Sequence, residues 1–181
     1  MGIDRDSTIE ELAATVSQAL EAAGIRAILS GGAAVALFSD NEYQSYDLDF
    51  VTSAQNSIIA AALEPLGFTR TRGLREFEHP DTDYYLEFPP GPLAFGETVV
   101  READVPVHDT PFGPLRVVTP TQCVMDRLAA YVNWHDNQSF DQAIAVARRQ
   151  PIDWGEVAHW GEREGVAGDL IASVRARANA G

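Results

Sequence analysis

The chain has 181 residues, enough for one well-buried core with a smaller appendage and too few for two full-sized domains. Its net charge is −14, and its thirteen cations are all arginine because it contains no lysine; a surface this acidic disfavours non-specific binding to DNA or RNA. The segment MGIDRDSTIEEL lacks a targeting pattern, and no apolar run approaches the roughly 18 residues of a membrane span, which predicts a soluble, cytoplasmic protein without a membrane partner.

The first elements expected are a helix, a strand, a glycine turn and a second helix. Ser7-Thr8-Ile9-Glu10 has the spacing of a capping box, and apolar residues then recur at helical spacing until Gly24. A short apolar strand is expected over 25–30, and it ends at the pair Gly31-Gly32. A helix is expected over 33–38.

Strands dominate the middle of the chain. Alternation and turn residues predict a helix over 53–66 and strands over 46–52, 68–72, 75–79 and 84–88. The last of these strands must stop at Pro89, because proline cannot donate to a β-ladder. Pro and Gly are frequent over 89–115, so we expect a long loop there with one strand at 98–101, followed by a strand at 115–118.

Helices dominate from residue 119 onward. We expect four of them, with start signals at Thr119-Pro120, at Ser139, at Asp153-x-x-Glu156 and before Leu170. The fold class is therefore α/β (α+β): a mixed sheet flanked by helices over 1–118, and a helical C-terminal region over 119–181 packed on it. Cys123, the single cysteine, is expected in the core. We also expect the three tryptophans in the core of the helical region rather than on a base-stacking platform, and these are Trp134, Trp154 and Trp160.

Asp47 and Asp49 share one face of the expected strand over 46–52. Side chains alternate in a strand, so Leu48 and Phe50 point to the core while both carboxylates point away. At roughly 6.5 to 7 Å between Cα atoms, two carboxylates can bind a hard divalent cation that relieves their repulsion. An isolated Asp-x-Asp is more often a solvated strand start, so this pattern alone leaves both interpretations open.

The segment Ser30-Gly31-Gly32 lies about fifteen residues upstream, at the end of an expected strand. Glycines let the backbone approach a phosphate, and the following helix offers free N–H groups. A glycine pair alone is more often an ordinary tight turn. The conjunction of this turn with a carboxylate pair is much rarer than either feature.

Together, LSGGAAVALF and YQSYDLDFV resemble the signature of the DNA polymerase beta-type nucleotidyltransferase superfamily. In that family a helix-opening Gly-Gly or Gly-Ser precedes an Asp-x-Asp strand. The pattern is most similar to abortive-infection and toxin–antitoxin nucleotidyltransferases, whose elements match Gly31, Gly32, Ala34, Asp47 and Asp49. The resemblance covers about residues 25–52. Those proteins usually carry a basic residue and a Ser or Thr before the carboxylates, whereas Gln44-Ser45-Tyr46 keeps the serine and lacks the base.

The resemblance implies a nucleotidyltransferase-type sheet and a metal-dependent reaction. A nucleoside monophosphate would move from a nucleoside triphosphate to a hydroxyl of an RNA end, a protein or a small molecule, and pyrophosphate would leave. Asp47 and Asp49 would bind Mg²⁺ or Mn²⁺, while Ser30, Gly31 and Gly32 would hold phosphate. A role in a toxin–antitoxin or defence system, with an antitoxin as partner, is also implied.

The family's third acid is expected on a later strand. Glu87 fits, because Leu86 and Phe88 face inward and Glu87 faces away. Its expected roles are metal ligand and general base for the attacking hydroxyl. Glu76 and Glu78 on the preceding strand are rivals, and a solvent-facing Glu87 is the alternative.

Arginines must supply any phosphate-binding charge. Arg70 and Arg72 share a face near the expected hairpin, and arginine binds phosphate through two parallel hydrogen bonds; the alternative is a charged edge strand that resists aggregation. Asp126-Arg127-Leu128 and Trp134-His135-Asp136 loosely resemble later motifs of the toxin family, where a Lys and an Asp complete the pocket. Arg127 is therefore a third candidate, and pairing with an acid on its own helix is its alternative.

Two other functions stay open. A phosphatase of the haloacid dehalogenase type also uses an Asp-x-Asp, but it normally needs a lysine that this chain lacks and places the pair on its first core strand. A non-catalytic binding protein or antitoxin could keep the fold without the chemistry. The missing base before Asp47 favours this second alternative.

Overall fold

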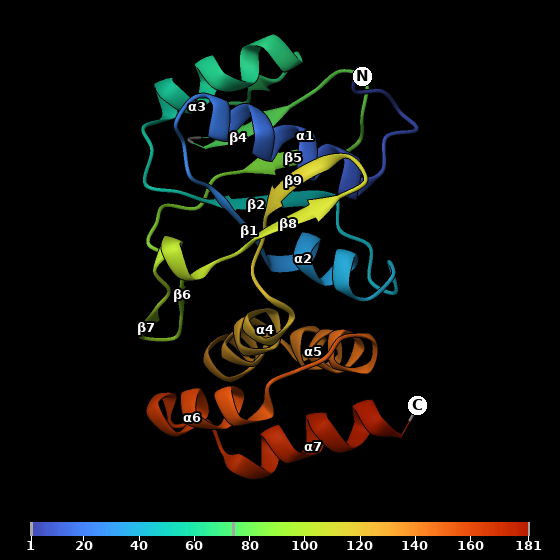
Figure 1. Cartoon of the computed structure of the whole chain (residues 1–181), viewed down its shortest axis with the longest axis vertical. Coiled ribbons are helices and arrows are strands. Elements are labelled where there is room, and N and C mark those ends of the chain that lie inside the picture. Colours follow the sequence, from blue (N-terminus) through green and yellow to red (C-terminus); the bar gives the residue numbers. More distant parts are fainter. Residues whose placement is uncertain (1, 74, 181) are drawn as a thin grey trace.

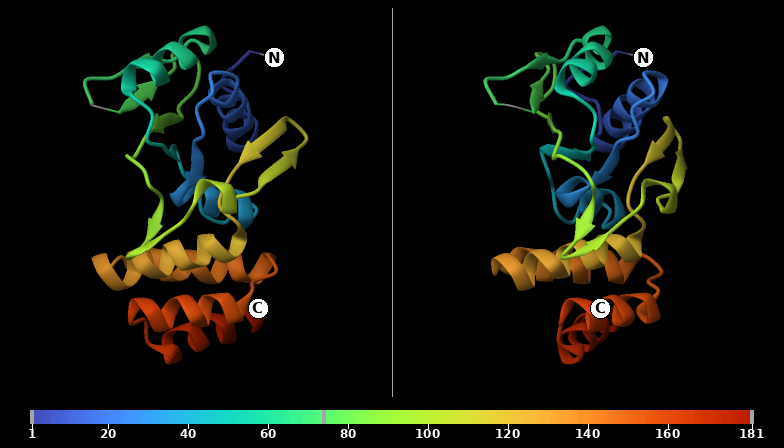
Figure 2. Two further views of the ribbon diagram at one scale, coloured as in Figure 1. Left: turned by 60° about the vertical axis from the view of Figure 1, so that its left-hand side comes forward. Right: turned by 90° about the vertical axis from the view of Figure 1, so that its left-hand side faces the viewer.

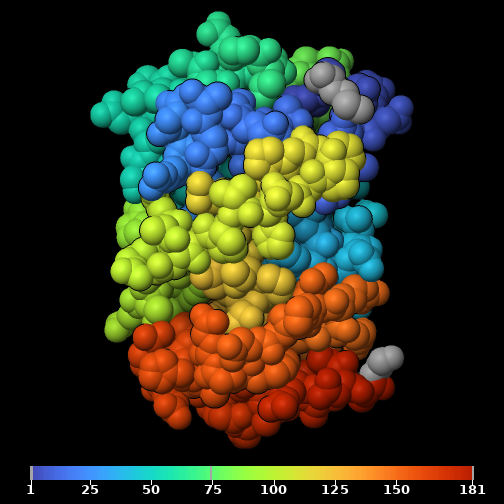
Figure 3. All heavy atoms as spheres, viewed as in Figure 1, coloured from blue at the N-terminus to red at the C-terminus, as the bar shows by residue number. Residues whose placement is uncertain are grey.

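The computed structural model describes residues 2–73 and 75–180. A mixed five-stranded sheet with its helices forms one half of the molecule, and four C-terminal helices form the other (Figure 1). The two halves are packed together without an open gap on the face shown in Figure 3. Among the described residues, the last strand ends at Arg116 and the first C-terminal helix begins at Pro120. Within the same part of the chain, no helix is both long and apolar enough to cross a membrane.

The sheet has the strand order β1-β2-β5-β4-β3. Its members are β1 (Ile28–Ser30), β2 (Asp47–Val51), β3 (Thr69–Arg70), β4 (Glu76–Glu78) and β5 (Tyr85–Glu87). Only the β2–β5 pair is parallel; the others are antiparallel. The strands are shorter than expected from the sequence, but all five occur. Their register sets four polar residues opposite one another across the sheet, in the order Ser30, Asp49, Glu87 and Glu76.

Three helices accompany the sheet. They are α1 (Ile9–Ala22), α2 (Gly31–Phe38) and α3 (Asn56–Leu63), the last followed by a single 3₁₀ turn, η1 (Glu64–Leu66). The N-cap of α1 is Thr8, whose hydroxyl accepts from the N–H of Glu11, one residue later than the expected capping box. The helix α2 begins at Gly31, so the glycine pair is its first turn and not a separate turn before it. This helix lies between the sheet and the C-terminal helices (Figure 1).

The expected long loop over 89–115 is wrong in part, because the structure has two small hairpins there. These are β6 (Ala94–Phe95) with β7 (Thr98–Val99), and β8 (Val107–Thr110) with β9 (Gly113–Arg116), separated by a 3₁₀ turn, η2 (Glu102–Asp104). The strand expected at 115–118 is β9, which begins two residues earlier.

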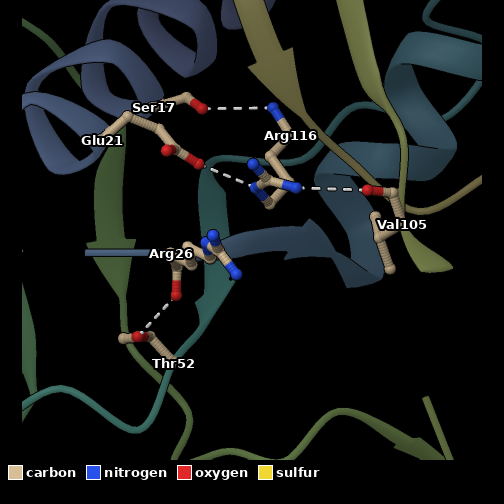
Figure 4. A network of polar contacts seen from close by, with 6 residues as sticks. All are labelled: Ser17, Glu21, Arg26, Thr52, Val105 and Arg116. Carbon is tan, nitrogen blue, oxygen red and sulfur yellow. Dashed lines mark hydrogen bonds and ion pairs between the residues drawn. The ribbon is translucent and has the colours of Figure 1, made fainter. Parts of the chain in front are cut away.

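Arg116 fastens the β8–β9 hairpin to α1 (Figure 4). Its backbone N–H donates to the hydroxyl of Ser17 at 3.1 Å, and its Nε donates to Glu21 Oε1 at 2.8 Å. Its Nη1 also donates to the carbonyl of Val105 at 3.2 Å. One arginine thus joins a helix, a loop and a strand.

The C-terminal half contains α4 (Pro120–Trp134), α5 (Asn137–Arg149), α6 (Trp154–Glu164) and α7 (Gly168–Asn179). Figure 2 shows α4 and α5 as the layer next to the sheet half, with α6 and α7 beyond them. The caps expected at Thr119 and Asp153 are confirmed. The cap expected at Ser139 is wrong: Asp136 caps α5 by accepting from the N–H of Gln138, and the hydroxyl of Ser139 donates to the same carboxylate.

The tryptophans do not all lie in the core. Trp160 is fully buried and its Nε1 donates to the carbonyl of Phe95 at 3.1 Å, as expected for a core tryptophan. Trp154 is partly buried. The expectation is wrong for Trp134, whose side chain is 80% exposed at the end of α4. Cys123 is buried as expected, and burial raises the pKa of its thiol.

Candidate active site

β2 presents two carboxylates on one face of the sheet. Leu48 and Phe50 are completely buried, while Asp47 and Asp49 alternate with them and are half-buried. The parallel register sets Glu87 beside Asp49 on the neighbouring strand β5. Neighbouring strands lie about 4.8 Å apart, so these two acids stand next to each other on the same face.

The first turn of α2 is packed against these acids. Gly31 has a left-handed backbone, with φ of 64°, and a Cβ atom built on it would lie 2.3 Å from Oδ2 of Asp49. A Cβ atom on Gly32 would lie 2.7 Å from the hydroxyl oxygen of Ser45. Only glycine can occupy the first position, because both the backbone and the carboxylate exclude a side chain. The N-cap side chain of Ser30 makes no capping hydrogen bond to a described residue, which leaves the N–H groups of this turn without a side-chain cap.

Ser45 orients the first carboxylate. Its hydroxyl donates to the Asp47 carboxylate and also lies 3.1 Å from the Asp47 backbone carbonyl. This is the serine that the sequence keeps immediately upstream of the acid pair. Its contact fixes the rotamer of Asp47 beside Gly32.

Burial and neighbouring carboxylates raise the pKa of Asp49 and of Glu87. Burial is the largest cause of the raised pKa of Asp49, which reaches about 7, and the neighbouring charges of Asp47 and Glu87 add to it, whereas Arg127 opposes it. Burial also raises the pKa of Glu87, followed by the charges of Asp47 and Glu76. Around Asp49, the negative charges of Asp47 and Glu87 therefore outweigh the positive charge of Arg127.

Asp47 and Asp49 are the residues that could hold a divalent cation. In the described part of the chain, no three His, Cys, Asp or Glu side chains form a cage that could enclose an ion unaided. Mg²⁺ does not need such a cage, because it is usually held by one or two carboxylates together with substrate phosphates and water. Asp47 and Asp49 are adjacent carboxylates that provide this kind of donor set, and burial together with the charge of Asp47 raises the pKa of Asp49.

Arg127 on α4 faces the acids from the helical half. It lines a pocket of about 420 Å³ together with Gly31, Gly32, Asp47 and Asp49, and among the described residues that line this pocket it is the only arginine. Asp126 accepts from its Nη2 at 2.6 Å and from its Nε at 3.1 Å, and Gln142 of α5 accepts from Nη1 at 3.3 Å. Arg127 therefore pairs with an acid of its own helix and still reaches the pocket.

The chain is similar to known proteins in its fold and not in its sequence. No protein-family model matches the chain, and no curated protein matches its sequence. An antigenic nucleotidyltransferase-like protein from Paracoccidioides brasiliensis is similar with a TM-score of 0.60 and 12% identity, over 93% of this chain and 94% of that one. The chain has the nucleotidyltransferase fold.

The antibiotic-resistance factor ANT(2'')-Ia shares this nucleotidyltransferase fold. Its solution structure has a TM-score of 0.50 and 12% identity, over 93% of this chain and 89% of that one. Its crystal structure in complex with adenylyl-2''-tobramycin has a TM-score of 0.52 and 17% identity, over 94% and 99% of the two chains. The family resemblance of residues 25–52 is thus confirmed at the level of the fold.

Two arginines expected at the site lie elsewhere in the nucleotidyltransferase fold. Arg70 and Arg72 are exposed on or just after β3, and the strands β5 and β4 separate β3 from β2. They are not among the residues that line the pocket. Arg75 has a structural role, because its guanidinium donates to the carbonyls of Thr52, Ala54 and Phe88.

Glu87 lies close to Asp47 and Asp49 but does not line their pocket. Glu87 raises the pKa of Asp49, yet it is not among the residues lining the pocket. Its rivals on β4, Glu76 and Glu78, are exposed, and Glu76 accepts from the hydroxyl of Thr71.

The α5 side of the pocket contains two residues, Gln138 and Gln142, that were not expected from the sequence. Asp136, Gln138 and Gln142 line it, opposite Asp47 and Asp49. Asp136 belongs to the Trp134-His135-Asp136 segment whose family resemblance is loose. The spacing of Gln138 and Gln142, four residues apart, places them on one helical face and could have indicated a shared surface.

Proposed function

We propose that this protein is a metal-dependent nucleotidyltransferase that moves a nucleoside monophosphate from a nucleoside triphosphate to a hydroxyl acceptor. One observation carries the proposal. The Asp47–Asp49 pair, the tightly packed first turn of α2 and the guanidinium of Arg127 all border the same pocket. Such a pocket combines groups that bind a divalent cation with groups that bind phosphate.

The phosphates would be held by two elements from the two halves of the molecule. The N–H groups at the start of α2 point along the helix axis and favour negative charge. Hydrogen bonds to Asp126 and Gln142 orient the Arg127 guanidinium, so its N–H groups are ordered before a nucleotide binds.

Asp47 and Asp49 would hold Mg²⁺ or Mn²⁺, which when bound would offset charge on the transferring phosphate and the leaving pyrophosphate. Glu87 is the proposed general base, since a carboxylate with a raised pKa accepts a proton more readily near neutral pH. The acceptor oxygen forms a bond to the α-phosphorus as the bond between that phosphorus and the bridging oxygen breaks. The hydroxyl proton passes to Glu87, and pyrophosphate leaves.

The acceptor in this proposal is an RNA end, a protein or a small molecule. The crystal structure of ANT(2'')-Ia is a complex with adenylyl-2''-tobramycin, a small molecule that carries an adenylyl group. The resemblance of residues 25–52 to abortive-infection proteins supports a defence role with an antitoxin partner.

A non-catalytic binding protein is the second candidate. It is favoured by the missing base before Asp47 and by the position of Glu87 outside the pocket lining. A haloacid dehalogenase-type phosphatase is less consistent with the structure, because Asp47 and Asp49 lie on the second strand of a mixed sheet.

The test compares the wild type with the double variant Asp47→Ala/Asp49→Ala. Each labelled nucleoside triphosphate is added with Mg²⁺ or Mn²⁺, and binding is measured by calorimetry. Pyrophosphate release and label transfer are then measured with total tRNA or protein extract as acceptor. We expect metal-dependent binding and pyrophosphate release by the wild type, and loss of both in the double variant.

The matched control is Asp81→Ala/Asp83→Ala, which removes a second Asp-x-Asp pair from an exposed turn outside the pocket. It should behave like the wild type. A wild-type protein with neither metal-dependent nucleotide binding nor transfer would establish the binding protein instead. Release of phosphate from a simple ester would establish the phosphatase.

A further inference from the structure

Trp134 lies on the surface of the protein at the C-terminal end of α4. Its side chain is 80% exposed, more than that of any other large hydrophobic residue that the structure describes. It is the last residue of α4, and His135 after it adopts a left-handed backbone with φ of 56°, which turns the chain into α5. Tryptophan is enriched at binding interfaces, because its large apolar ring system also carries a polar N–H.

The tryptophan borders a hollow that adjoins the proposed active site. This hollow has a volume of about 810 Å³, and its lining includes Asn133, Trp134 and Arg163. Arg127 lines both this hollow and the pocket beside Asp47 and Asp49, which is called the catalytic pocket in this proposal. Asp136, two residues after Trp134, also lines the catalytic pocket. The two spaces therefore adjoin at the Arg127 side chain.

The spacing along α4 matches the length of a nucleotide. Trp134 is seven residues after Arg127, about two helical turns, so both lie on the same side of the helix with an axial separation of about 10.5 Å. The small side chain of Ala130 lies between them and lines the hollow. A nucleotide whose phosphates contact Arg127 spans a comparable distance from its phosphate chain to its base.

We propose that Trp134 stacks on the base of the nucleoside triphosphate, with Asn133 and Arg163 at the edge of the ring. This inference rests on the proposed function and adds the site of the base to it. Stacking on an aromatic face tolerates every base, and a purine offers the larger surface. Asn and Arg side chains can each form paired hydrogen bonds with a purine edge, which favours ATP or GTP over CTP and UTP.

The test measures nucleotide binding, so it does not depend on turnover or on knowing the acceptor. ATP, GTP, CTP, UTP and inorganic tripolyphosphate are titrated by calorimetry in the presence of Mg²⁺. Trp134→Ala should raise the Kd for ATP or GTP about 5- to 100-fold, as expected for a lost stacking contact, and leave the Kd for tripolyphosphate unchanged. Trp134→Phe should recover most of the affinity. ATP or GTP should quench the tryptophan fluorescence of the wild type and have a much smaller effect in Trp134→Phe.

Ile58→Ala is the matched control, because Ile58 is an exposed hydrophobic residue on α3 outside the hollow. It should bind nucleotides like the wild type. The inference is overturned, while the proposed function stands, if Trp134→Ala binds ATP and GTP like the wild type. An equal loss of nucleotide and tripolyphosphate affinity also overturns it, since stacking acts on the base alone. If the wild type binds no nucleotide, the proposed function and this inference fail together.

Discussion

The carboxylate of Asp49 occupies the space in which Gly31 would carry a side chain. Gly31→Ala should therefore displace Asp49 and lower nucleotide binding to the level of Asp49→Ala. The left-handed backbone at this position adds a penalty of about 1–2 kcal/mol to the free energy of folding. Calorimetric titration with nucleotide and urea denaturation would measure the two effects separately.

Gly24→Ala separates backbone strain from contact. Gly24 has a similar φ of 73°, but a Cβ atom at this position would meet nothing within 4 Å. Gly24→Ala should therefore lower the free energy of unfolding by about 1–2 kcal/mol through backbone strain alone. It should keep the nucleotide affinity of the wild type. Equal losses of affinity in Gly24→Ala and Gly31→Ala would show that the contact with Asp49 has no role of its own.

Arg127→Met should weaken nucleotide binding about 10- to 100-fold, because a charged hydrogen bond contributes about 1.5–3 kcal/mol. Methionine keeps much of the packing volume and removes the only arginine lining the described part of the pocket. Binding of ATP and of tripolyphosphate should fall together, since the lost contact is to phosphate. The control is Arg148→Met, which removes an arginine paired with Glu42 outside the pocket and should leave both affinities unchanged.

Local signals in the sequence were enough to predict the two elements that lie together at the candidate site, the first turn of α2 and the strand β2. The alternation around Asp47 and Asp49 is a property of one strand, and the glycine pair is a property of one turn, so both could be interpreted without the rest of the chain. The same holds for the caps at Thr119 and Asp153. The β8–β9 hairpin was missed because β8 has no buried residue, and its strand depends on pairing with β9.

Strand order could not be predicted locally. Arg70 and Arg72 follow the acid pair closely in sequence, but β5 and β4 are inserted between β2 and β3 in the sheet. The arginine that reaches the pocket, Arg127, comes from a helix of the other half. The exposure of Trp134 likewise follows from where α4 ends relative to its neighbours, which helical periodicity does not specify.

The raised pKa of Asp49 predicts that this residue destabilises the metal-free protein at neutral and alkaline pH. Its pKa is about 7 in the folded protein against 3.8 for an unperturbed aspartate, so the folded state holds the proton more tightly and stability falls as pH rises from about 4 to 7. Asp49→Asn should therefore raise the free energy of unfolding at pH 8 by about 2–4 kcal/mol and change it little at pH 4. Urea denaturation in the presence of a chelator measures both free energies of unfolding. An equal effect of Asp49→Asn at pH 4 and pH 8 would contradict the raised pKa of Asp49.

Arg116→Ala should destabilise the protein without affecting nucleotide binding. The side chain is only 14% exposed, and its loss leaves the Val105 carbonyl and the Glu21 carboxylate without this donor, which costs about 1–3 kcal/mol. Arg116 does not line the pocket beside Asp47 and Asp49, so the Kd for ATP should stay at the wild-type value. Arg101→Ala is the control, because Arg101 pairs with Asp104 on the open surface and its removal should leave the urea midpoint unchanged. Equal urea midpoints for Arg116→Ala and the wild type would show that the hairpin is held to α1 without the Arg116 side chain.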